Sequence, residues 1–177
     1  MRPQNAARER GCNEPLSDGR SNTNVPSSEI PKQSSPGEEV LYTESFAIRG
    51  NDFDRGGEVA ARVKAILKQL GIDPSIIRRL SIANFEAEMN VIMYADEAQL
   101  KLDVLPNAVR IEIADRGQGI PDIGLAMQEG YSTATQAMRE RGFGAGLGLP
   151  NIKRNSDEFE IQSAVGKGTT LRYLVRL

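Results

Sequence analysis

The sequence has no histidine and no tryptophan among its 177 residues, and its single cysteine is Cys12. Without an imidazole the chain cannot form a Ser-His-Asp or Cys-His catalytic group, a histidine-ligated metal site or a phosphohistidine. One cysteine excludes an internal disulfide, a cysteine-only zinc site and a dithiol redox pair, which favours a reducing compartment. These absences exclude the common histidine- and cysteine-dependent chemistries.

Strong charge of one sign and long apolar runs are also missing. The chain has 22 lysines and arginines against 24 aspartates and glutamates, a net charge of -2 and a pI near 5.4, which gives no electrostatic reason to bind nucleic acid or an anionic membrane. No apolar run approaches the roughly 18 to 20 residues that cross a bilayer, and no apolar signal core is visible at the N-terminus. We therefore expect a cytoplasmic protein with no direct nucleic-acid or membrane partner.

Residues 1–38 differ in composition from the rest of the chain. They contain five of the nine prolines and six serines, with few large apolar side chains. Such a segment buries too little surface to offset its ordering entropy, so we predict a disordered N-terminal tail. A start codon assigned too far upstream and a short docking peptide are the alternatives. The folded domain is predicted to occupy residues 39–177.

From residue 40 onward the apolar pattern predicts an α+β fold, a two-layer sandwich with a mixed, mostly antiparallel sheet and helices on one face. Apolar residues at helical spacing from Val59 to Leu70 predict one helix, and Asp73-Pro74 predicts the start of a second that runs to about Ala95. Residues 115–148 are rich in glycine and read as irregular. Strands are predicted over 40–48, 100–104, 109–113, 159–165 and 169–177, and a short helix over 149–156.

The second helix carries two polar residues within an apolar sequence. Glu86 and Asn90 lie about 40° apart around a helix, whereas Glu88 lies about 200° from Glu86. The neighbouring Ile82 and Met93 predict that the Glu86–Asn90 face points to the interior, where a carboxylate and an amide need partners. A metal–nucleotide complex would supply them. A solvated stripe with fortuitous spacing is the alternative.

Asp115 follows directly after a predicted strand and begins the sequence Asp-Arg-Gly-Gln-Gly. A carboxylate fixed at a strand end can accept a hydrogen bond from an exocyclic amine. Gly117 and Gly119 let the backbone pass close to a flat ring or a phosphate. A turn with an Asx-type hydrogen bond is the alternative.

Alternate glycines precede the short helix, in the sequence Gly-Phe-Gly-Ala-Gly-Leu-Gly over 142–148. Such a run exposes backbone N–H groups to an anion at a helix N-terminus. It matches neither the dinucleotide-binding pattern nor the P-loop. A mobile linker is the alternative. Further along, Gly166-Lys167-Gly168 followed by Thr169 predicts a hairpin turn.

The order and spacing of these four motifs resemble those of the GHKL ATPases, the Bergerat-fold superfamily that includes the histidine kinases. The helix with E-x-x-x-N is similar to their N box, and the three glycine motifs are similar to their glycine boxes, over residues 40–177. Within that superfamily, the sequences from Glu86 to Ala95, Gly119 to Ile123 and Glu129 to Thr133 are similar to the serine/threonine protein kinases of bacterial sigma-factor partner switching, of the stressosome switch type. The segment between Thr133 and Gly142 looks several residues longer than in those kinases.

The resemblance implies a role for each matching residue. Glu86 would be the general base or would orient the partner's hydroxyl, Asn90 would hold Mg²⁺ against the ATP phosphates, and Asp115 would bind the adenine amino group. Thr169 would support the adenine pocket. The remaining nucleotide-binding residues implied by the resemblance are Gly117, Gly119, Ile120, Gly142, Gly144, Ala145, Gly146, Leu147 and Gly148.

The function implied by the resemblance is that of an ATP- and Mg²⁺-dependent protein serine/threonine kinase. Its substrate would be a regulatory protein of the antagonist or stressosome type, with a sigma factor and a second copy of the chain as further candidate partners. One alternative is an ATP-gated anti-sigma factor or docking protein with little kinase turnover. Another is a stand-alone sensor-kinase catalytic domain acting in trans, since the chain has no phospho-accepting histidine.

Overall fold

The structure is a computed structural model that describes residues 39–177, and the predicted tail over 1–38 lies outside the described residues. The described strands and helices follow one another in the order predicted, with three additional short helices. The elements are β1 (Tyr42–Arg49), η1 (Phe53–Arg55), α1 (Glu58–Gln69), α2 (Pro74–Tyr94), β2 (Ala95–Val104), β3 (Ala108–Gly117), α3 (Ile123–Ala126), α4 (Gln136–Glu140), α5 (Gly148–Arg154), β4 (Glu158–Ala164) and β5 (Gly168–Arg176).

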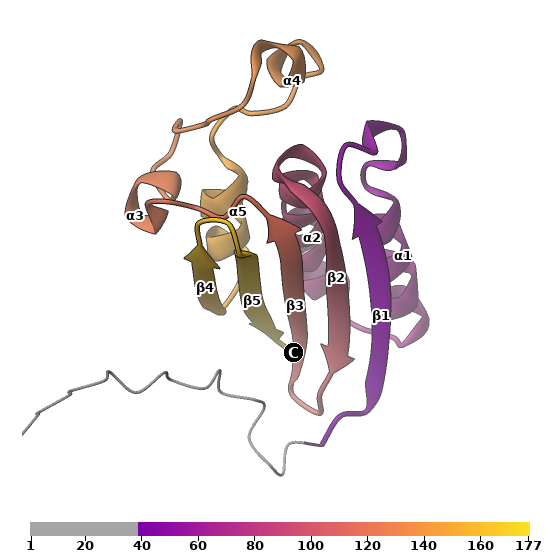
Figure 1. Ribbon diagram of the computed structural model, residues 1–177. Coiled ribbons are helices and arrows are strands. Elements are labelled where there is room, and N and C mark those ends of the chain that lie inside the picture. Colours follow the sequence, from indigo (N-terminus) through magenta and orange to yellow (C-terminus); the bar gives the residue numbers. More distant parts are fainter. Residues whose placement is uncertain (1–38) are drawn as a thin grey trace, which may run out of the picture. The chain divides into compact units, whose positions relative to one another are not determined.

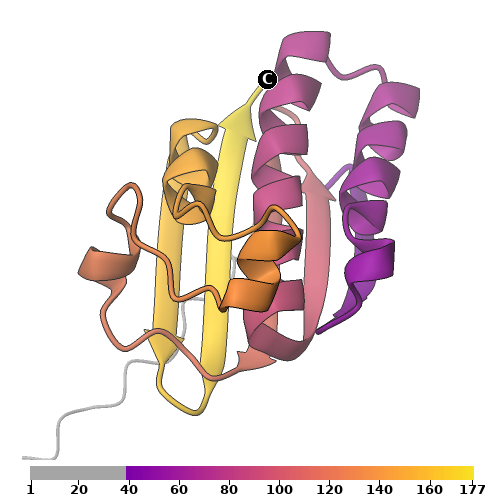
Figure 2. The same ribbon diagram turned by 90° about the horizontal axis from the view of Figure 1, so that it is seen from above.

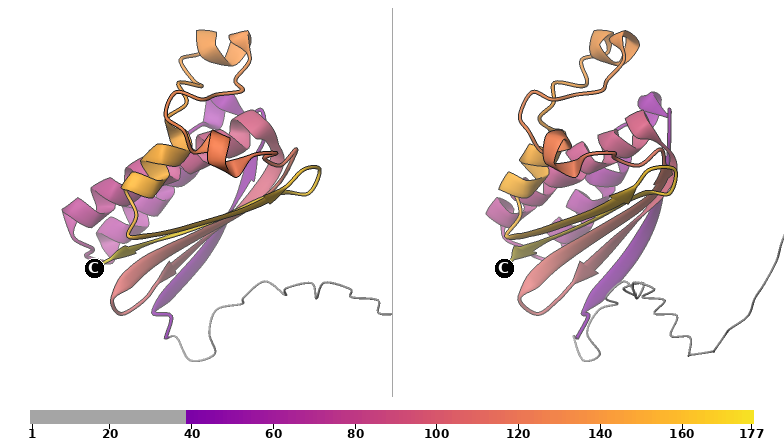
Figure 3. Two further views of the ribbon diagram at one scale, coloured as in Figure 1. Left: turned by 90° about the vertical axis from the view of Figure 1, so that its left-hand side faces the viewer. Right: turned by 60° about the vertical axis from the view of Figure 1, so that its left-hand side comes forward.

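The strands form one five-stranded sheet in the order β1-β2-β3-β5-β4. Helices α1, α2 and α5 cover one face of this sheet and leave the other open, as Figures 1 and 3 show. The predicted fold class, a two-layer α+β sandwich, is confirmed. The expectation of a mixed sheet was wrong in detail, because all four pairings between the described strands are antiparallel.

The hydrophobic core lies between the sheet and the helices. Alternate residues of β2 and β3, among them Leu100, Leu102 and Ile111, are fully buried. This alternation places every second side chain on the helix-covered face, as a half-buried strand requires. The core also holds one polar contact, because the Tyr173 hydroxyl donates a hydrogen bond to the side-chain oxygen of Asn84 over 2.5 Å. Burial of these apolar faces stabilises the sheet and fixes its register.

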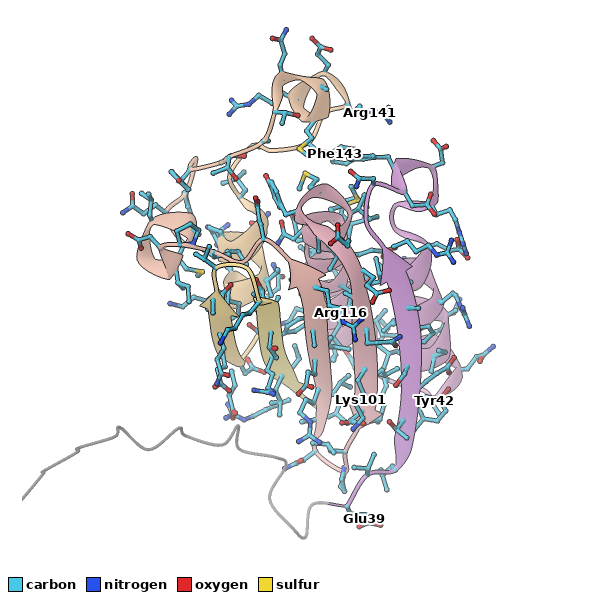
Figure 4. The ribbon with its side chains drawn as sticks, viewed as in Figure 1. Glu39, Tyr42, Lys101, Arg116, Arg141 and Phe143 are labelled. Carbon is cyan, nitrogen blue, oxygen red and sulfur yellow. The ribbon has the colours of Figure 1, made fainter. Side chains whose placement is uncertain are left out.

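The open face of the sheet carries charged side chains in cross-strand rows. In one row Lys101 lies opposite Glu112, Glu112 opposite Arg172, and Arg172 opposite Glu160. Opposite charges on neighbouring strands stabilise such a row, and Arg172 donates to Glu112 over 2.6 Å. Figure 4 shows Lys101 on this side of the sheet. The open face is therefore a solvated surface, and the core lies on the helix side alone.

Helix α2 passes directly into β2. Its start was predicted correctly: Asp73 caps it by accepting a 2.8 Å hydrogen bond from the Ser75 N–H, and Pro74 is its first residue. Its end was also close to prediction. Strand β2, however, begins at Ala95 instead of 100, because no loop separates it from the helix.

Residues 118–147, which we name the lid segment, connect β3 to α5. The sequence predicts them to be irregular, and most are, but they include two short helices. Asp122 caps α3 by accepting from the Leu125 N–H over 2.9 Å, and Thr135 caps α4 by accepting from the Met138 N–H over 3.3 Å. Figures 1 and 2 show α3 and α4 outside the two layers of the sandwich. Within residues 39–177, no helix is both long and apolar enough to span a membrane.

Candidate nucleotide-binding site

A cavity of about 930 Å³ lies between α2, the lid segment and the N-terminal end of α5. Its floor is formed by side chains from the helix-covered face of the sheet, including Ile113, Ile161 and Leu171. Helix α2 contributes Phe85 and Tyr94 to one wall. The size and the largely apolar lining are those of a pocket for a small organic ligand.

The cavity brings together nearly all the residues singled out in the sequence. Glu86 and Asn90 come from α2, Asp115 from the end of β3, and Thr169 from the start of β5. Gly117 is not among the lining residues; it lies at the end of β3, where a Cβ atom would approach the Tyr94 carbonyl oxygen to 2.8 Å. The other predicted residues that line the cavity are Gly119, Ile120, Gly142, Gly144, Ala145, Gly146, Leu147 and Gly148.

Glu86 and Asn90 face the first residue of α5. A Cβ atom on Gly148 would lie 3.1 Å from Asn90 Oδ1 and 3.5 Å from Glu86 Oε2. Glu86 Oε1 accepts a 2.7 Å hydrogen bond from Asn151 Nδ2, one turn further along α5. Among the residues that the structure describes, none forms a hydrogen bond with the Asn90 amide. A carboxylate held at one oxygen and an unpartnered amide therefore lie side by side at the cavity wall.

Ile82 does not lie where the sequence predicts it. The structure leaves 38% of Ile82 exposed, so the face of α2 that carries Glu86 is not buried against the sheet. Instead it turns from solvent at Ile82 to the cavity at Glu86 and Asn90, both of which are half-buried. The lid segment and the start of α5 lie across the cavity from this part of α2, so this face lines the cavity instead of the core.

Asp115 lines the cavity near the end of β3 and is fixed by the hairpin between β4 and β5. Its Oδ1 accepts a 3.0 Å hydrogen bond from the Thr169 N–H. Burial raises the pKa of Asp115, and the hydrogen bonds from Thr169 and Gly117 oppose that rise. The adjoining Gly168 has φ of 93°, and a Cβ there would lie 2.1 Å from the Asp115 carbonyl oxygen. Only glycine allows the hairpin to approach Asp115 this closely.

The lid segment closes over the cavity through a glycine-rich stretch. Gly142, Gly144 and Gly146 all have positive φ. At Gly146 a Cβ atom would lie 2.4 Å from the carbonyl carbon of Gly130, whose N–H donates to the Gly146 oxygen over 2.9 Å. Alternating left-handed residues turn successive N–H groups toward a common side, an arrangement that suits anions.

One aromatic contact joins the lid segment to the turn before α1. The rings of Phe143 and Phe53 have their centroids 6.0 Å apart. The Arg141 guanidinium lies over the Phe53 ring, 4.9 Å from its centroid. Figure 4 shows Arg141 and Phe143 together at the base of α4. Phe53, Phe143 and Arg141 form what we name the aromatic clasp.

Two functional residues escape the sequence analysis. Asn151, which holds Glu86, is separated from it by 65 residues, and no local pattern links the two. Glu88 is only 2% exposed and accepts hydrogen bonds from the backbone N–H groups of Gly57, Val59 and Ala60 over 2.8 to 3.1 Å. It thereby satisfies the N-terminus of α1. Glu88 lies on a different face of α2 from Glu86, as predicted, but its burial was not predicted.

The residues present fit a nucleotide with a divalent cation. Within residues 39–177 no cluster of three or more carboxylates and thiols could hold a metal ion alone. An ion at Asn90 would take its other oxygens from phosphates and water, which is how Mg²⁺ is usually bound. An unpartnered amide such as that of Asn90 suits a hydrated cation bound to phosphates, and a carboxylate such as that of Asp115 suits a base that carries an amino group.

Known proteins resemble this chain in sequence. The serine/threonine-protein kinase RsbT of Bacillus subtilis (strain 168) is 33% identical over 120 residues, which cover 64% of this chain and 84% of RsbT. An anti-sigma F factor of Caldanaerobacter subterraneus subsp. tengcongensis is 34% identical over 108 residues, which cover 57% of this chain and 72% of that factor.

Two solved structures share the fold at lower identity. The RsbU and RsbW domains of Rv1364c from Mycobacterium tuberculosis superpose with a TM-score of 0.53 at 18% identity, over 77% of this chain and 32% of that chain. A chain of the SiaB-SiaC complex from Pseudomonas aeruginosa gives a TM-score of 0.53 at 16% identity, over 78% of this chain and 90% of that one. A family model described as "Histidine kinase-like ATPase domain" matches residues 51–174, which include every residue that lines the cavity. The chain belongs to the histidine kinase-like ATPase domain family.

Proposed function

We propose that this chain is an ATP- and Mg²⁺-dependent protein serine/threonine kinase that phosphorylates a regulatory partner protein in a partner-switching pathway. Relatives named as a serine/threonine-protein kinase and as an anti-sigma F factor support this function. The observation that carries the proposal is the convergence of Glu86, Asn90 and Gly148 at one wall of the cavity. A general base (Glu86), a cation ligand (Asn90) and a glycine that leaves room for phosphates (Gly148) then lie side by side.

At the base end of the cavity, the Asp115 carboxylate accepts a hydrogen bond from the adenine amino group. Guanine carries a carbonyl oxygen at the equivalent ring position, which would face the carboxylate without a donor, so the site favours adenine. The Thr169 N–H holds Asp115 in place. Thr169 is itself fixed, because its hydroxyl lies 2.9 Å from that of Ser163.

At the phosphate end, Asn90 would hold Mg²⁺, and a cation there would neutralise charge on the phosphates of the substrate ATP. The backbone N–H groups of Gly144, Gly146 and Gly148 donate hydrogen bonds to the phosphate oxygens. Glu86 accepts the proton of the partner's serine or threonine hydroxyl as that oxygen bonds to the γ-phosphorus and the bond to ADP breaks. Asn151 orients Glu86 through the 2.7 Å hydrogen bond.

A second function, ATP-gated binding of a sigma factor, is supported by the similarity to anti-sigma F factors. It would use the same nucleotide site, with the bound ATP shaping a docking surface. A pull-down of a purified sigma factor with and without Mg-ATP distinguishes it: ATP-dependent capture without a phosphoprotein product favours this second function over the first.

The kinase function is tested by incubating the full chain with radiolabelled ATP, Mg²⁺ and the small regulatory proteins encoded beside its gene. We expect one of them to be labelled on serine or threonine. The Glu86→Gln variant should transfer phosphate roughly 100- to 10,000-fold more slowly, because the neutral amide cannot accept the proton. Its affinity for ATP should stay unchanged.

The matched control is Glu97→Gln, which makes the same chemical change at an exposed carboxylate of β2 paired with Arg116. Because Glu97 lies outside the cavity, this variant should transfer phosphate at the wild-type rate. Equal rates for wild type and Glu86→Gln would refute the assigned base. Absence of labelling with every neighbouring partner, together with tight ATP binding, would refute the kinase function.

A further inference from the structure

The outward face of α2 carries a stripe of exposed side chains. Arg78, Ile82 and Phe85 are spaced four and three residues apart, so they lie on one side of the helix. They are exposed, with 38% of Ile82 and 42% of Phe85 accessible to solvent. Large apolar side chains together on the solvent side of a helix are an unusual feature that often marks a contact surface.

A second hollow of about 420 Å³ lies beside this stripe, between α1 and α2. Figure 2 shows these two helices side by side on the sheet. Three cations line the hollow, namely Lys64, Lys68 and Arg78, and no carboxylate does. We name this surface the basic groove; the rest of its lining is Ile72, Pro74, Ile77, Ser81 and Ile82.

The cations of the basic groove are not neutralised by the fold. Among the described residues, none forms an ion pair with Lys64, Lys68 or Arg78. The neighbouring cations are paired: Arg62 lies 3.6 Å from a Glu44 oxygen, and Arg79 lies 2.6 Å from Asp157. The whole chain has a net charge of -2, so the attraction of this groove for a negatively charged partner would be local.

The stripe joins the basic groove to the reaction site. Ile82 lines the groove, while Phe85 and Glu86 line the nucleotide cavity. Arg78 and Glu86 are eight residues apart on one helix, which is about 12 Å along its axis. An extended segment of about four residues spans that distance. A chain with its hydroxyl at Glu86 therefore reaches the cations of the groove within a few residues.

We propose that the basic groove docks an acidic segment of the protein substrate, close in its sequence to the acceptor serine or threonine. Carboxylates of that segment pair with Lys64, Lys68 and Arg78, and an apolar side chain packs on Ile82 and Phe85. The proposal rests on the proposed kinase function. A nucleic acid is a poorer occupant, because three cations beside two exposed apolar side chains offer few phosphate contacts.

The first test measures docking without catalysis. The probe is a fluorescent peptide of about 12 residues with alternating aspartates and leucines, compared by anisotropy with the same peptide carrying asparagines. We expect the full chain to bind the acidic peptide at least about tenfold more tightly than the neutral one, and Lys68→Glu/Arg78→Glu to lose this preference. The control Arg49→Glu/Lys153→Glu reverses two exposed cations elsewhere and should keep it.

Two results of this test would overturn the proposal. One is equal binding of both peptides by the wild-type chain, and the other is an unchanged preference in Lys68→Glu/Arg78→Glu with the fold intact by circular dichroism. A DNA duplex or anionic vesicles that bind in competition with the peptide, and are lost in the same variant, would overturn the assigned occupant.

The second test uses the partner protein labelled in the kinase assay. Lys68→Glu/Arg78→Glu should raise the KM for that partner about tenfold or more, with kcat and ATP affinity unchanged, since neither residue lines the nucleotide cavity. An unchanged KM would overturn the docking proposal and leave the kinase function standing. If wild type labels no partner, the kinase function fails, and the peptide test still reports on the groove.

Discussion

The lid segment and the rest of the domain are held together by different forces. The scaffold, by which we mean residues 42–117 and 148–176, has a continuous core of buried apolar side chains. In the lid segment, residues 118–147, only Ala134 is buried. The lid segment is held instead by caps on its two short helices, by glycine backbone contacts and by the aromatic clasp.

This difference separates stability from ligand binding. Segments with few buried contacts open at low free energy, and such segments commonly close over bound ligands. We therefore expect the scaffold to set the free energy of unfolding and the lid segment to set how fast nucleotide enters and leaves. Substitutions in each region should change one of these quantities and spare the other.

Helix α2 contains the same division within a single turn. Glu88 points into the scaffold, where burial raises its pKa and three backbone N–H groups oppose that rise. Glu86 points into the cavity, where one side-chain amide, from Asn151, contacts it. One carboxylate completes the fold, and the other remains available for chemistry.

The largest effect is expected from Glu88→Ala, which leaves buried backbone N–H groups of α1 without an acceptor. Each such group costs about 1–3 kcal/mol, so we expect at least about 3 kcal/mol less stability in urea unfolding. The matched control is Glu86→Ala on the same helix, which should change stability by less than about 0.5 kcal/mol. Equal losses in the two variants would contradict the division along α2.

The sequence predicted most of the scaffold, because long periodic patterns report burial directly. Helix α1, predicted from the apolar spacing that begins at Val59, and the alternating strands β2 and β3 are examples. Helices of three to five residues are too short for a periodic pattern. Helices α3 and α4 each have one side-chain cap, from Asp122 and Thr135, and η1 has none.

The sequence predicted those site residues that belong to a local motif. It did not predict contacts between residues far apart in the chain. The spacing of Glu86 and Asn90 identified their shared face without any structure. The Asn151–Glu86 hydrogen bond and the capping of α1 by Glu88 join residues that are 65 and about 30 positions apart. No local pattern encodes such pairs.

The next largest effect is expected from Asp115→Asn, which changes a scaffold residue that is proposed to bind the adenine base. Asparagine keeps an oxygen to accept from Thr169, so the fold should remain intact, but its amide group opposes the adenine amine. We expect ATP affinity to fall about 10- to 100-fold by calorimetry, with an unchanged melting temperature. Preference for ATP over GTP should fall in parallel.

The control for this variant is Asp122→Asn. Asp122 also lines the cavity, but its carboxylate caps α3, a role that asparagine fills equally well. Its ATP affinity should match that of the wild type. Unchanged affinity in Asp115→Asn would refute the adenine contact, whereas a large fall in its melting temperature would assign Asp115 to the scaffold alone.

The smallest effect is expected from Phe53→Ala, which removes the scaffold side of the aromatic clasp. Loss of one ring pair and one cation–π contact costs about 1 kcal/mol. Because these contacts hold the lid segment, we expect a fluorescent ATP analogue to dissociate roughly 2- to 10-fold faster in stopped-flow measurements. Phe53 also packs against the edge of the core, so a small loss of stability should accompany the faster release. Arg141→Ala removes the cation alone and should give a smaller acceleration.

The control is Arg55→Ala, which alters the same turn at a residue paired with Glu58. The ATP analogue should dissociate from this variant at the wild-type rate. A comparable acceleration in Arg55→Ala would mean that the turn, and not the aromatic clasp, controls the lid segment.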